Sequence, residues 1–219
     1  MATETTSAAK AEILRRVRKA NGGSRDAVAA EAAWNQISRE YRHEAALAPD
    51  SMLDLLEDRL RDYDAHVVRV QRAEIAANVA RVLAARGRRR IVVPAGIADE
   101  WLPEGFEFVI DNGMAATDLD EFDGVLTGST VAIAETGTIV LQNAAGQGRR
   151  AVTLVPDYHL CIVEVSDVVG TVPEAMGRLR ATATLPITFF SGPSATADIE
   201  MTRIKGVHGP RFLDVILAS

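Results

Sequence analysis

The pattern of apolar and polar positions changes at about residue 50. Before that point, Ala11, Ile13, Leu14 and Val17 recur at helical spacing among charged residues, which predicts a helix that ends at residues 21–23. Residues 24–48 are rich in alanine and have few apolar anchors, namely Trp34, Ile37 and Tyr41. We therefore expect residues 1–49 to form an N-terminal helical arm, which packs over the main domain or reaches a neighbour. The alternative, which the sparse apolar pattern favours, is a solvated arm, because terminal segments of this kind usually order weakly.

From residue 50 the pattern predicts an α/β domain that continues to residue 219. Residues 51–60 read as an amphipathic helix with its N-cap at Asp50 or Ser51. A strand at 66–70, a helix at 73–85 and a strand at 90–93 then form a β-α-β unit. Such a unit implies parallel strands with helices on the faces of the sheet. A short helix at 97–102 and strands at 106–110 and 123–127 continue the alternation.

The stretch after residue 130 is the most strand-like part of the chain. It predicts short β-branched strands at 131–134, 138–141, 151–155 and 160–165. Residues 135–137 are too few for a crossover, so the first two of these strands should form an antiparallel hairpin. A helix at 171–179 and strands at 186–190 and 212–217 complete a mixed, mainly parallel sheet with flanking helices.

Composition fits a globular protein, because 47% of the 219 residues are hydrophobic and 25% are charged. No apolar run approaches the roughly 20 residues that span a bilayer, and residues 1–10 have no signal-peptide core, so we expect a cytoplasmic protein. Cys161 is the single cysteine, which excludes an internal disulfide and a cysteine-ligated iron–sulfur cluster held by one chain.

Charge is distributed unevenly along the chain. Residues 1–90 carry a net charge of +4 and residues 91–219 a net charge of −10, which together give the total of −6. The basic half mixes its cations with acids and lacks interleaved aromatic residues, so the pattern argues against nucleic-acid binding. The same charge pattern is consistent with an N-terminal half that faces a partner protein.

The first candidate site is the polar stretch that follows the apolar run ending at Phe190. Turns of this kind leave backbone N–H groups unpaired at the end of a sheet, where they and nearby hydroxyls can hold an anion. The candidate ligand-binding residues here are Ser191, Gly192, Ser194, Thr196, Asp198, Glu200, His208 and Gly209. The alternative is a capped helix start with solvated acids.

The second candidate is the turn between the two hairpin strands. Glu135 would be held rigidly there, as a nucleophile or general base, with Thr136, Gly137 and Thr138 beside it. By spacing alone, the alternative of a water-exposed turn acid is favoured. Arg149 and Arg150 end a glycine loop and could pair with an anionic ligand.

Other chemistry-bearing residues favour structural interpretations. Asp157 and His159 share a strand face, so the carboxylate could orient the imidazole, but a hydrogen-bonded structural histidine fits as well. Cys161 lies among aliphatic residues and reads as a buried small hydrophobe. We expect no metal site, and interpret one acidic run as a solvated helix end: Asp118, Asp120, Glu121 and Asp123.

Four separated segments carry a family resemblance. GSTVAIAETGTIVL, RRAVTLVPDYH, SGPSATADIE and GVHGP, in this order, resemble the lactate utilisation protein C family of the LUD domain superfamily, over about residues 50–218. The resemblance implies a fold similar to ribose-5-phosphate isomerases and coenzyme A transferases. It also implies a role in a bacterial three-protein system that oxidises L-lactate to pyruvate, in which iron–sulfur clusters belong to partner proteins and this chain has no cofactor.

Two classes of function follow from the resemblance. In the first, the chain is a non-redox subunit that assembles with the iron–sulfur partners and contributes a small-anion pocket from the two candidate turns. In the second, it is an independent enzyme of the coenzyme A transferase or sugar-phosphate isomerase type that uses Glu135. The sequence departs from the transferases at Thr136, where those enzymes typically have asparagine.

Overall fold

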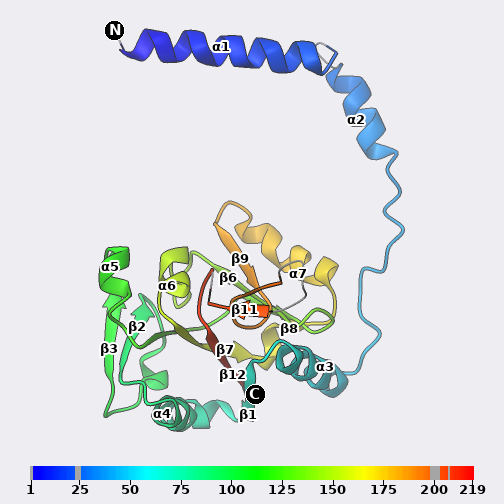
Figure 1. Ribbon diagram of the computed structural model, residues 1–219. Helices are drawn as coiled ribbons and strands as arrows, with labels where there is room; N and C mark the ends of the chain where they lie inside the picture. The colour runs from blue at the N-terminus through cyan, green and yellow to red at the C-terminus, as the bar shows by residue number, and fades with distance from the viewer. Residues whose placement is uncertain (1, 23–25, 198–202, 207) are drawn as a thin grey trace. The chain divides into compact units, whose positions relative to one another are not determined.

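The computed structural model describes residues 2–22, 26–197, 203–206 and 208–219. They divide into two units, Met1–Tyr41 and Arg42–Ser219 (Figure 1). The sequence places the boundary after Pro49, whereas residues 42–49 belong to the second unit. There the carbonyl of His43 accepts a hydrogen bond of 3.2 Å from the hydroxyl of Thr171.

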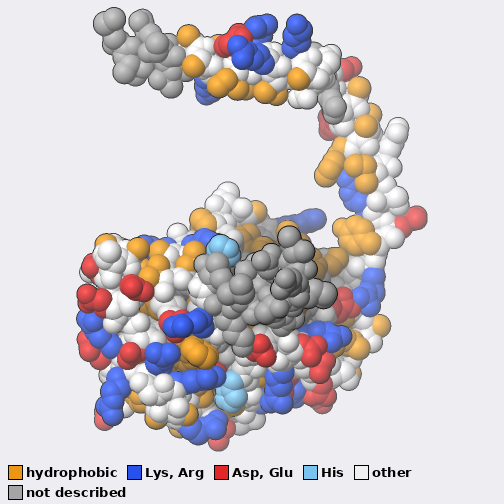
Figure 2. All heavy atoms as spheres, in the orientation of Figure 1, with side chains coloured by type: hydrophobic (Ala, Val, Ile, Leu, Met, Phe, Trp, Pro, Cys, Tyr) orange, Lys and Arg blue, Asp and Glu red, His pale blue; other side chains and the backbone are white. Residues whose placement is uncertain are grey.

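The first unit contains the helices α1 (Ala2–Ala20) and α2 (Ala27–Asn35). Asp26 caps α2, because its carboxylate accepts a hydrogen bond of 2.9 Å from the backbone N–H of Val28. The apolar side chains Ile13, Val17 and Trp34 are exposed, and the orange spheres along this unit in Figure 2 show such side chains. The helix predicted from residue 11 is therefore present, and it begins earlier than the apolar pattern indicated.

The second unit is built on a six-stranded sheet with the order β1-β12-β7-β4-β2-β3, in which all neighbours are parallel. The strands are β1 (His66–Val70), β2 (Arg90–Pro94), β3 (Glu107–Asp111), β4 (Gly124–Thr127), β7 (Tyr158–Glu164) and β12 (Phe212–Ala218). The α/β class and the mainly parallel sheet predicted from the sequence are confirmed. The two ends of the predicted β-α-β unit lie in this sheet, but they are not adjacent.

The antiparallel hairpin is also confirmed, and it belongs to a second sheet. That sheet has four strands in the order β8-β5-β6-β9, with β5 antiparallel to β6. Its strands are β5 (Val131–Ile133), β6 (Thr138–Gln142), β8 (Val168–Val169) and β9 (Ile187–Phe190). A separate pair joins β10 (Ala195–Ala197) to β11 (Arg203–Lys205).

Helices complete the layers of the second unit. Its α-helices are α3 (Pro49–Asp62), α4 (Ile75–Ala85), α5 (Ala116–Leu119), α6 (Arg150–Leu154) and α7 (Val172–Leu179). Short 3₁₀ turns are η1 (Arg72–Glu74), η2 (Asp99–Trp101), η3 (Val165–Asp167) and η4 (Arg180–Thr182).

Two local predictions are wrong. The helix α3 begins at Pro49 and is capped by Ala48, not by Asp50 or Ser51, because proline is well suited to the first helical position. The strand predicted at residues 151–155 is instead the helix α6. Short apolar runs do not distinguish a strand from a buried helix, and Val152 here packs beside Val92 and Leu119.

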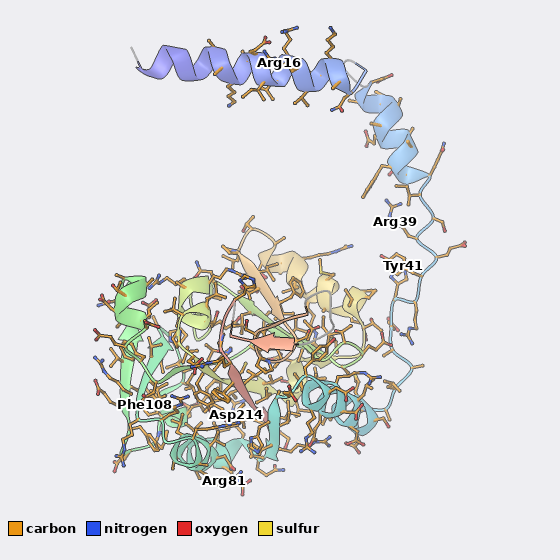
Figure 3. The ribbon with its side chains drawn as sticks, in the orientation of Figure 1. Arg16, Arg39, Tyr41, Arg81, Phe108 and Asp214 are labelled. Carbon is orange, nitrogen blue, oxygen red and sulfur yellow. The ribbon has the colours of Figure 1, made fainter. Side chains whose placement is uncertain are left out.

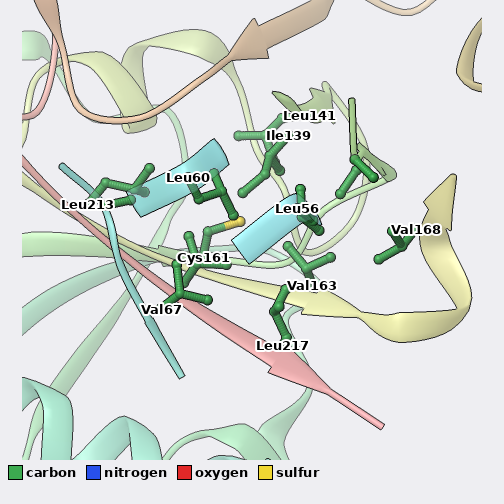
Figure 4. Packing of buried hydrophobic residues seen from close by; sticks show 14 residues of the cluster. Leu56, Leu60, Val67, Ile139, Leu141, Cys161, Val163, Val168, Leu213 and Leu217 are labelled. Carbon is green, nitrogen blue, oxygen red and sulfur yellow. The ribbon is translucent and has the colours of Figure 1, made fainter. Parts of the chain in front are cut away.

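The core lies on both faces of the parallel sheet. On one face, α4 packs through Val79 and Leu83. On the other face, α3 and the second sheet enclose Cys161, Val163 and their neighbours (Figure 4). The helix α7 covers the outer face of the second sheet. This arrangement leaves β9 facing the amino-terminal halves of β7 and β12, where the candidate site lies.

A buried carboxylate ties strands β7 and β12 to helix α4. Asp214, labelled in Figure 3, is 1% exposed and accepts hydrogen bonds of 3.0 and 2.7 Å from the guanidinium of Arg86. The hydroxyl of Tyr158 donates a third hydrogen bond of 2.8 Å. Burial and the charge of Asp214 raise the pKa of Tyr158, so this hydroxyl keeps its proton as a donor.

None of the described helices is long and apolar enough to cross a lipid bilayer. On the face shown in Figure 2, blue and red side chains are mixed over the second unit.

Candidate functional site

A cavity of about 260 Å³ lies between the second sheet and the parallel sheet. His159 and Leu213, which are register partners on β7 and β12, belong to its wall on the side of the parallel sheet. The remaining lining residues come from α6, from β9 and from the turns that follow: Arg150, Thr153, Leu154, Thr188, Phe189, Phe190, Ser191, Gly192, Pro193, Ser194, His208, Gly209 and Pro210. The volume is below the roughly 300–1,000 Å³ of drug-sized sites, so the cavity suits a small ligand.

The structure brings together most of the first candidate group. The cavity is lined by Ser191, Gly192, Ser194, His208 and Gly209. Thr196 lies in the strand β10, in register with Ile204 of β11. Asp198 and Glu200 lie outside the described residues.

Ser194 holds the two turns of this group against each other. Its hydroxyl accepts a hydrogen bond of 3.0 Å from the backbone N–H of His208. Its own N–H donates to the carbonyl of Pro210 at 2.7 Å, and its carbonyl accepts from the N–H of Gly206 at 2.9 Å. These three bonds fix the distance between the turn after β9 and the turn before β12, which makes Ser194 a positioning residue for the cavity wall.

The glutamate of the hairpin turn does not line the cavity. Glu135 forms an ion pair with Arg42 and is not among the lining residues. Gly137 has φ +62°, and a Cβ there would lie 2.6 Å from the Cβ of Arg59. The glycine therefore lets the turn pack closely on α3. The expectation that Glu135 would share one pocket with the serines is not met.

The neighbouring hydroxyls are linked to the cavity through Ser191, which lines it. Thr136 Oγ1 donates to Thr138 Oγ1 at 2.7 Å, and Thr138 Oγ1 lies 2.7 Å from Ser191 Oγ. Because the oxygen of Thr138 accepts the hydrogen bond from Thr136, its own hydroxyl proton can be donated to the oxygen of Ser191. The Ser191 hydroxyl proton is then available to a ligand.

The two arginines of the glycine loop have different surroundings. Arg149 donates hydrogen bonds of 2.8 and 3.0 Å to Asp111, and these bonds hold the pKa of that carboxyl below its usual value. Arg149 is thus a structural residue. Among the described residues, Arg150 donates only to the hydroxyl of Thr188, at 3.2 Å, and forms no ion pair with a carboxylate. Its charge is available to an anion in the cavity.

Asp157 and His159 do not pair, and His159 is hydrogen-bonded elsewhere, as the structural interpretation of the sequence expected. Asp157 accepts hydrogen bonds from Arg211 at 2.5 and 2.9 Å. His159 is 3% exposed, and its Nε2 lies 2.8 Å from the hydroxyl of Thr127. Burial lowers the pKa of His159 to about 3, so the ring is neutral at physiological pH.

Cys161 and the acidic run have structural surroundings. Cys161 is fully buried, as the sequence predicted, and burial raises the pKa of its thiol to about 12. Asp123 accepts hydrogen bonds from the backbone N–H groups of Arg89 and Arg90 at 2.8 and 2.9 Å. Within the described part of the chain, no three His, Cys, Asp or Glu side chains are placed to hold a metal ion.

A second cavity, of about 270 Å³, lies at the carboxyl ends of the parallel strands. It sits between the loops that follow β2 and β4, the point where the strand order reverses, which is where α/β sheets commonly bind ligands. Ser129 Oγ and Trp101 Nε1, on two of its lining residues, are buried without partners. However, Arg72 of its wall is neutralised by Glu164 at 2.8 Å, so we favour the first cavity, where Arg150 is not paired with acid.

Sequence patterns assigned no role in this second cavity to Gly128 and Ser129. The signal that could have identified them is a glycine and a serine directly after a buried strand, β4. His159 was likewise read as structural, because its place beside a cavity depends on β9 packing over β7 and not on its neighbours in sequence.

Comparison with known proteins gives the family. The LUD domain profile matches residues 53–218. The chain belongs to the LUD domain family. Within this family, the Lactate utilization protein C of Deinococcus radiodurans is 41% identical over 218 residues, which cover 98% of each chain. The Lactate utilization protein C of Geobacillus kaustophilus is 30% identical over 76% of this chain and 78% of its own.

A solved structure gives the same assignment. The crystal structure of a DUF162 family protein from Deinococcus radiodurans is 38% identical to this chain and superimposes with a TM-score of 0.69. The match covers 79% of this chain and 99% of that structure. The resemblance to the LUD domain family noted in the sequence is therefore confirmed by both sequence and fold.

Proposed function

We propose that this chain is a non-redox subunit of a bacterial L-lactate utilisation system, which acts with iron–sulfur partner proteins in the oxidation of lactate to pyruvate. The single observation that carries the proposal is the similarity to the Lactate utilization protein C of Deinococcus radiodurans along almost the whole length of both chains. A match of this extent includes the N-terminal unit as well as the LUD domain.

The cysteine content supports the non-redox part of the proposal. A cysteine-ligated cluster needs several thiolates, and the sequence has only Cys161. That thiol is buried in the core with Val163 and with Val215, its register partner on β12, and its raised pKa keeps it protonated. Electron transfer in the system is therefore assigned to the partners.

The first cavity supports a contact with a small anion. Arg150 supplies a positive charge that no described carboxylate neutralises, and Ser191 and Thr188 supply hydroxyls. No aspartate or glutamate is among the lining residues that the structure describes. An anion would therefore meet attraction without a competing carboxylate.

The surroundings of Glu135 favour the subunit over the independent enzyme. The carboxylate is ion-paired with Arg42 and does not line the cavity. A nucleophile or general base must come within hydrogen-bond reach of a bound substrate. We therefore assign Glu135 to the packing of the hairpin turn.

The test is a deletion of the gene in its source organism, complemented by an affinity-tagged copy. We expect loss of growth on L-lactate, its return with the tagged chain, and recovery of cysteine-rich, iron-containing proteins with the tag. The Glu135→Gln copy should restore growth as well as the wild-type copy does. Normal growth of the deletion strain on L-lactate would refute the proposal. Failure of the Glu135→Gln copy alone, although it is folded and abundant, would instead favour the enzyme.

A further inference from the structure

A chain of hydrogen bonds beneath the first cavity accommodates the Nε2-protonated tautomer of His159. The thiol of Cys161 donates to the carbonyl of Gly128 at 3.7 Å, and a carbonyl can only accept. The hydroxyl of Thr127 donates to Cys161 Sγ at 3.7 Å. With the proton of Thr127 on Sγ, its oxygen accepts from His159 Nε2 at 2.8 Å, whereas the opposite direction would put the ring proton on Nδ1. We adopt the first direction, which places the imidazole proton on Nε2 and leaves a lone pair on Nδ1.

His159 belongs to the wall of the cavity. Nδ1 of His159 has no hydrogen-bond partner among the described residues, although the side chain is almost completely buried. The partnerless buried nitrogen and oxygen atoms of the described side chains are those of Arg88, Trp101 and Ser129. His159 itself is among the residues that line the cavity.

The cavity therefore presents two complementary groups to a ligand. Arg150, beside Thr188, presents a cation. His159 presents a neutral acceptor on the side of the parallel sheet, and this acceptor requires a donor such as a hydroxyl. Phe190, whose ring centroid lies 5.2 Å from that of His159, and Leu213 leave an apolar surface for a short alkyl group.

We propose that this cavity binds a small hydroxy-carboxylate, with the carboxylate on Arg150 and the hydroxyl donated to Nδ1 of His159. The inference deepens the proposed function, on which it rests, by naming the ligand class of the subunit. It involves binding alone, without a redox step. The low pKa of His159 supports it, because a protonated ring would present no acceptor to the hydroxyl.

The test is isothermal titration calorimetry of the full-length chain with L-lactate and with propionate, which lacks the hydroxyl. We expect L-lactate to bind at least fivefold more tightly than propionate. In His159→Phe, lactate should bind no better than propionate, while propionate binds as it does to the wild type. Equal affinity of the wild type for both acids, or no binding of either, would overturn the inference.

A matched pair of arginine variants tests the carboxylate contact. Arg150→Gln should weaken the binding of both acids at least tenfold, whereas Arg89→Gln, an equal change of charge at an exposed position that does not line the cavity, should leave both unchanged. An unaltered affinity in Arg150→Gln would overturn the assignment of the carboxylate.

A spectroscopic measurement covers the case in which His159→Phe does not fold. The ¹⁵N chemical shifts of the wild-type imidazole should show a protonated Nε2 and an unprotonated Nδ1, and lactate should shift the Nδ1 resonance. A protonated Nδ1 would overturn the inference. If the chain fails to bind lactate and yet remains necessary for growth on lactate, the inference falls while the proposed subunit role stands.

Discussion

The hydroxyl of Thr127 lies 2.8 Å from Nε2 of His159, across two neighbouring strands of the parallel sheet. This bond satisfies one nitrogen of an imidazole that is almost wholly buried, and the other nitrogen is left to the cavity. Burial lowers the pKa of His159 and keeps the ring neutral in the folded chain, and this has a measurable effect on stability.

The first prediction concerns the pH dependence of that stability. The pKa of His159 is lowered to about 3 in the folded chain, against about 6.5 when unfolded. Below pH 6.5 the unfolded chain binds a proton that the folded chain does not, so the free energy of unfolding falls as the pH falls toward 3. Between pH 7 and pH 5 the loss from this group should be about 2 kcal/mol. Urea denaturation of the wild type and of His159→Gln should show the smaller pH dependence in the variant, and equal slopes would contradict the assignment.

The second prediction concerns the buried carboxylate. Asp214→Ala leaves the guanidinium of Arg86 and the hydroxyl of Tyr158 without their acceptor, and should lower the free energy of unfolding by about 2–4 kcal/mol. Tyr158→Phe removes only one donor and should cost about 1 kcal/mol. Asp54→Ala, which breaks an exposed pair with Arg69, serves as the control and should cost less than about 1 kcal/mol. A similar loss in all three variants would show that Asp214 has no special role.

The third prediction compares two glycines. Gly137→Ala places a Cβ within 2.6 Å of the Cβ of Arg59 at a positive φ, and should destabilise the chain by about 1–3 kcal/mol. Gly177 lies in α7, and a Cβ added there has nothing within 4 Å. Gly177→Ala should therefore stabilise the folded chain by about 0.5–1 kcal/mol. Thermal unfolding measures both, and a change of the same sign in the two variants would argue against the packing of the turn on α3.

The order of helices and strands could be read from the sequence because apolar residues recur at helix or strand spacing wherever an element packs on the core. The hairpin is an example, since the three residues from Glu135 to Gly137 cannot cross a sheet. The helix α6 was not recognised because a run of only five residues fits the spacing of a helix and that of a strand. The division into two sheets depends on long-range pairing, such as that of β6 with β9, which no local pattern contains.

The candidate site could be predicted only in part, because some of its contacts join segments that are distant in sequence. Ser191, Ser194 and His208 lie in polar turns that their composition identifies, and they do meet in one cavity. Glu135 was placed with them although it pairs with Arg42. His159 was taken as structural, because its surroundings depend on Thr127 and on β9, which are distant from it in sequence.

The most direct test of the central claim is a ¹H–¹⁵N NMR titration of the full-length chain with sodium L-lactate. If the first cavity is the ligand site, the amide resonances of Ser191, Gly192 and Gly209 should shift with saturation, while those of Gly96 and Ser129, at the second cavity, should not. Saturable shifts confined to Gly96 and Ser129, or no saturable shift at all, would contradict the account.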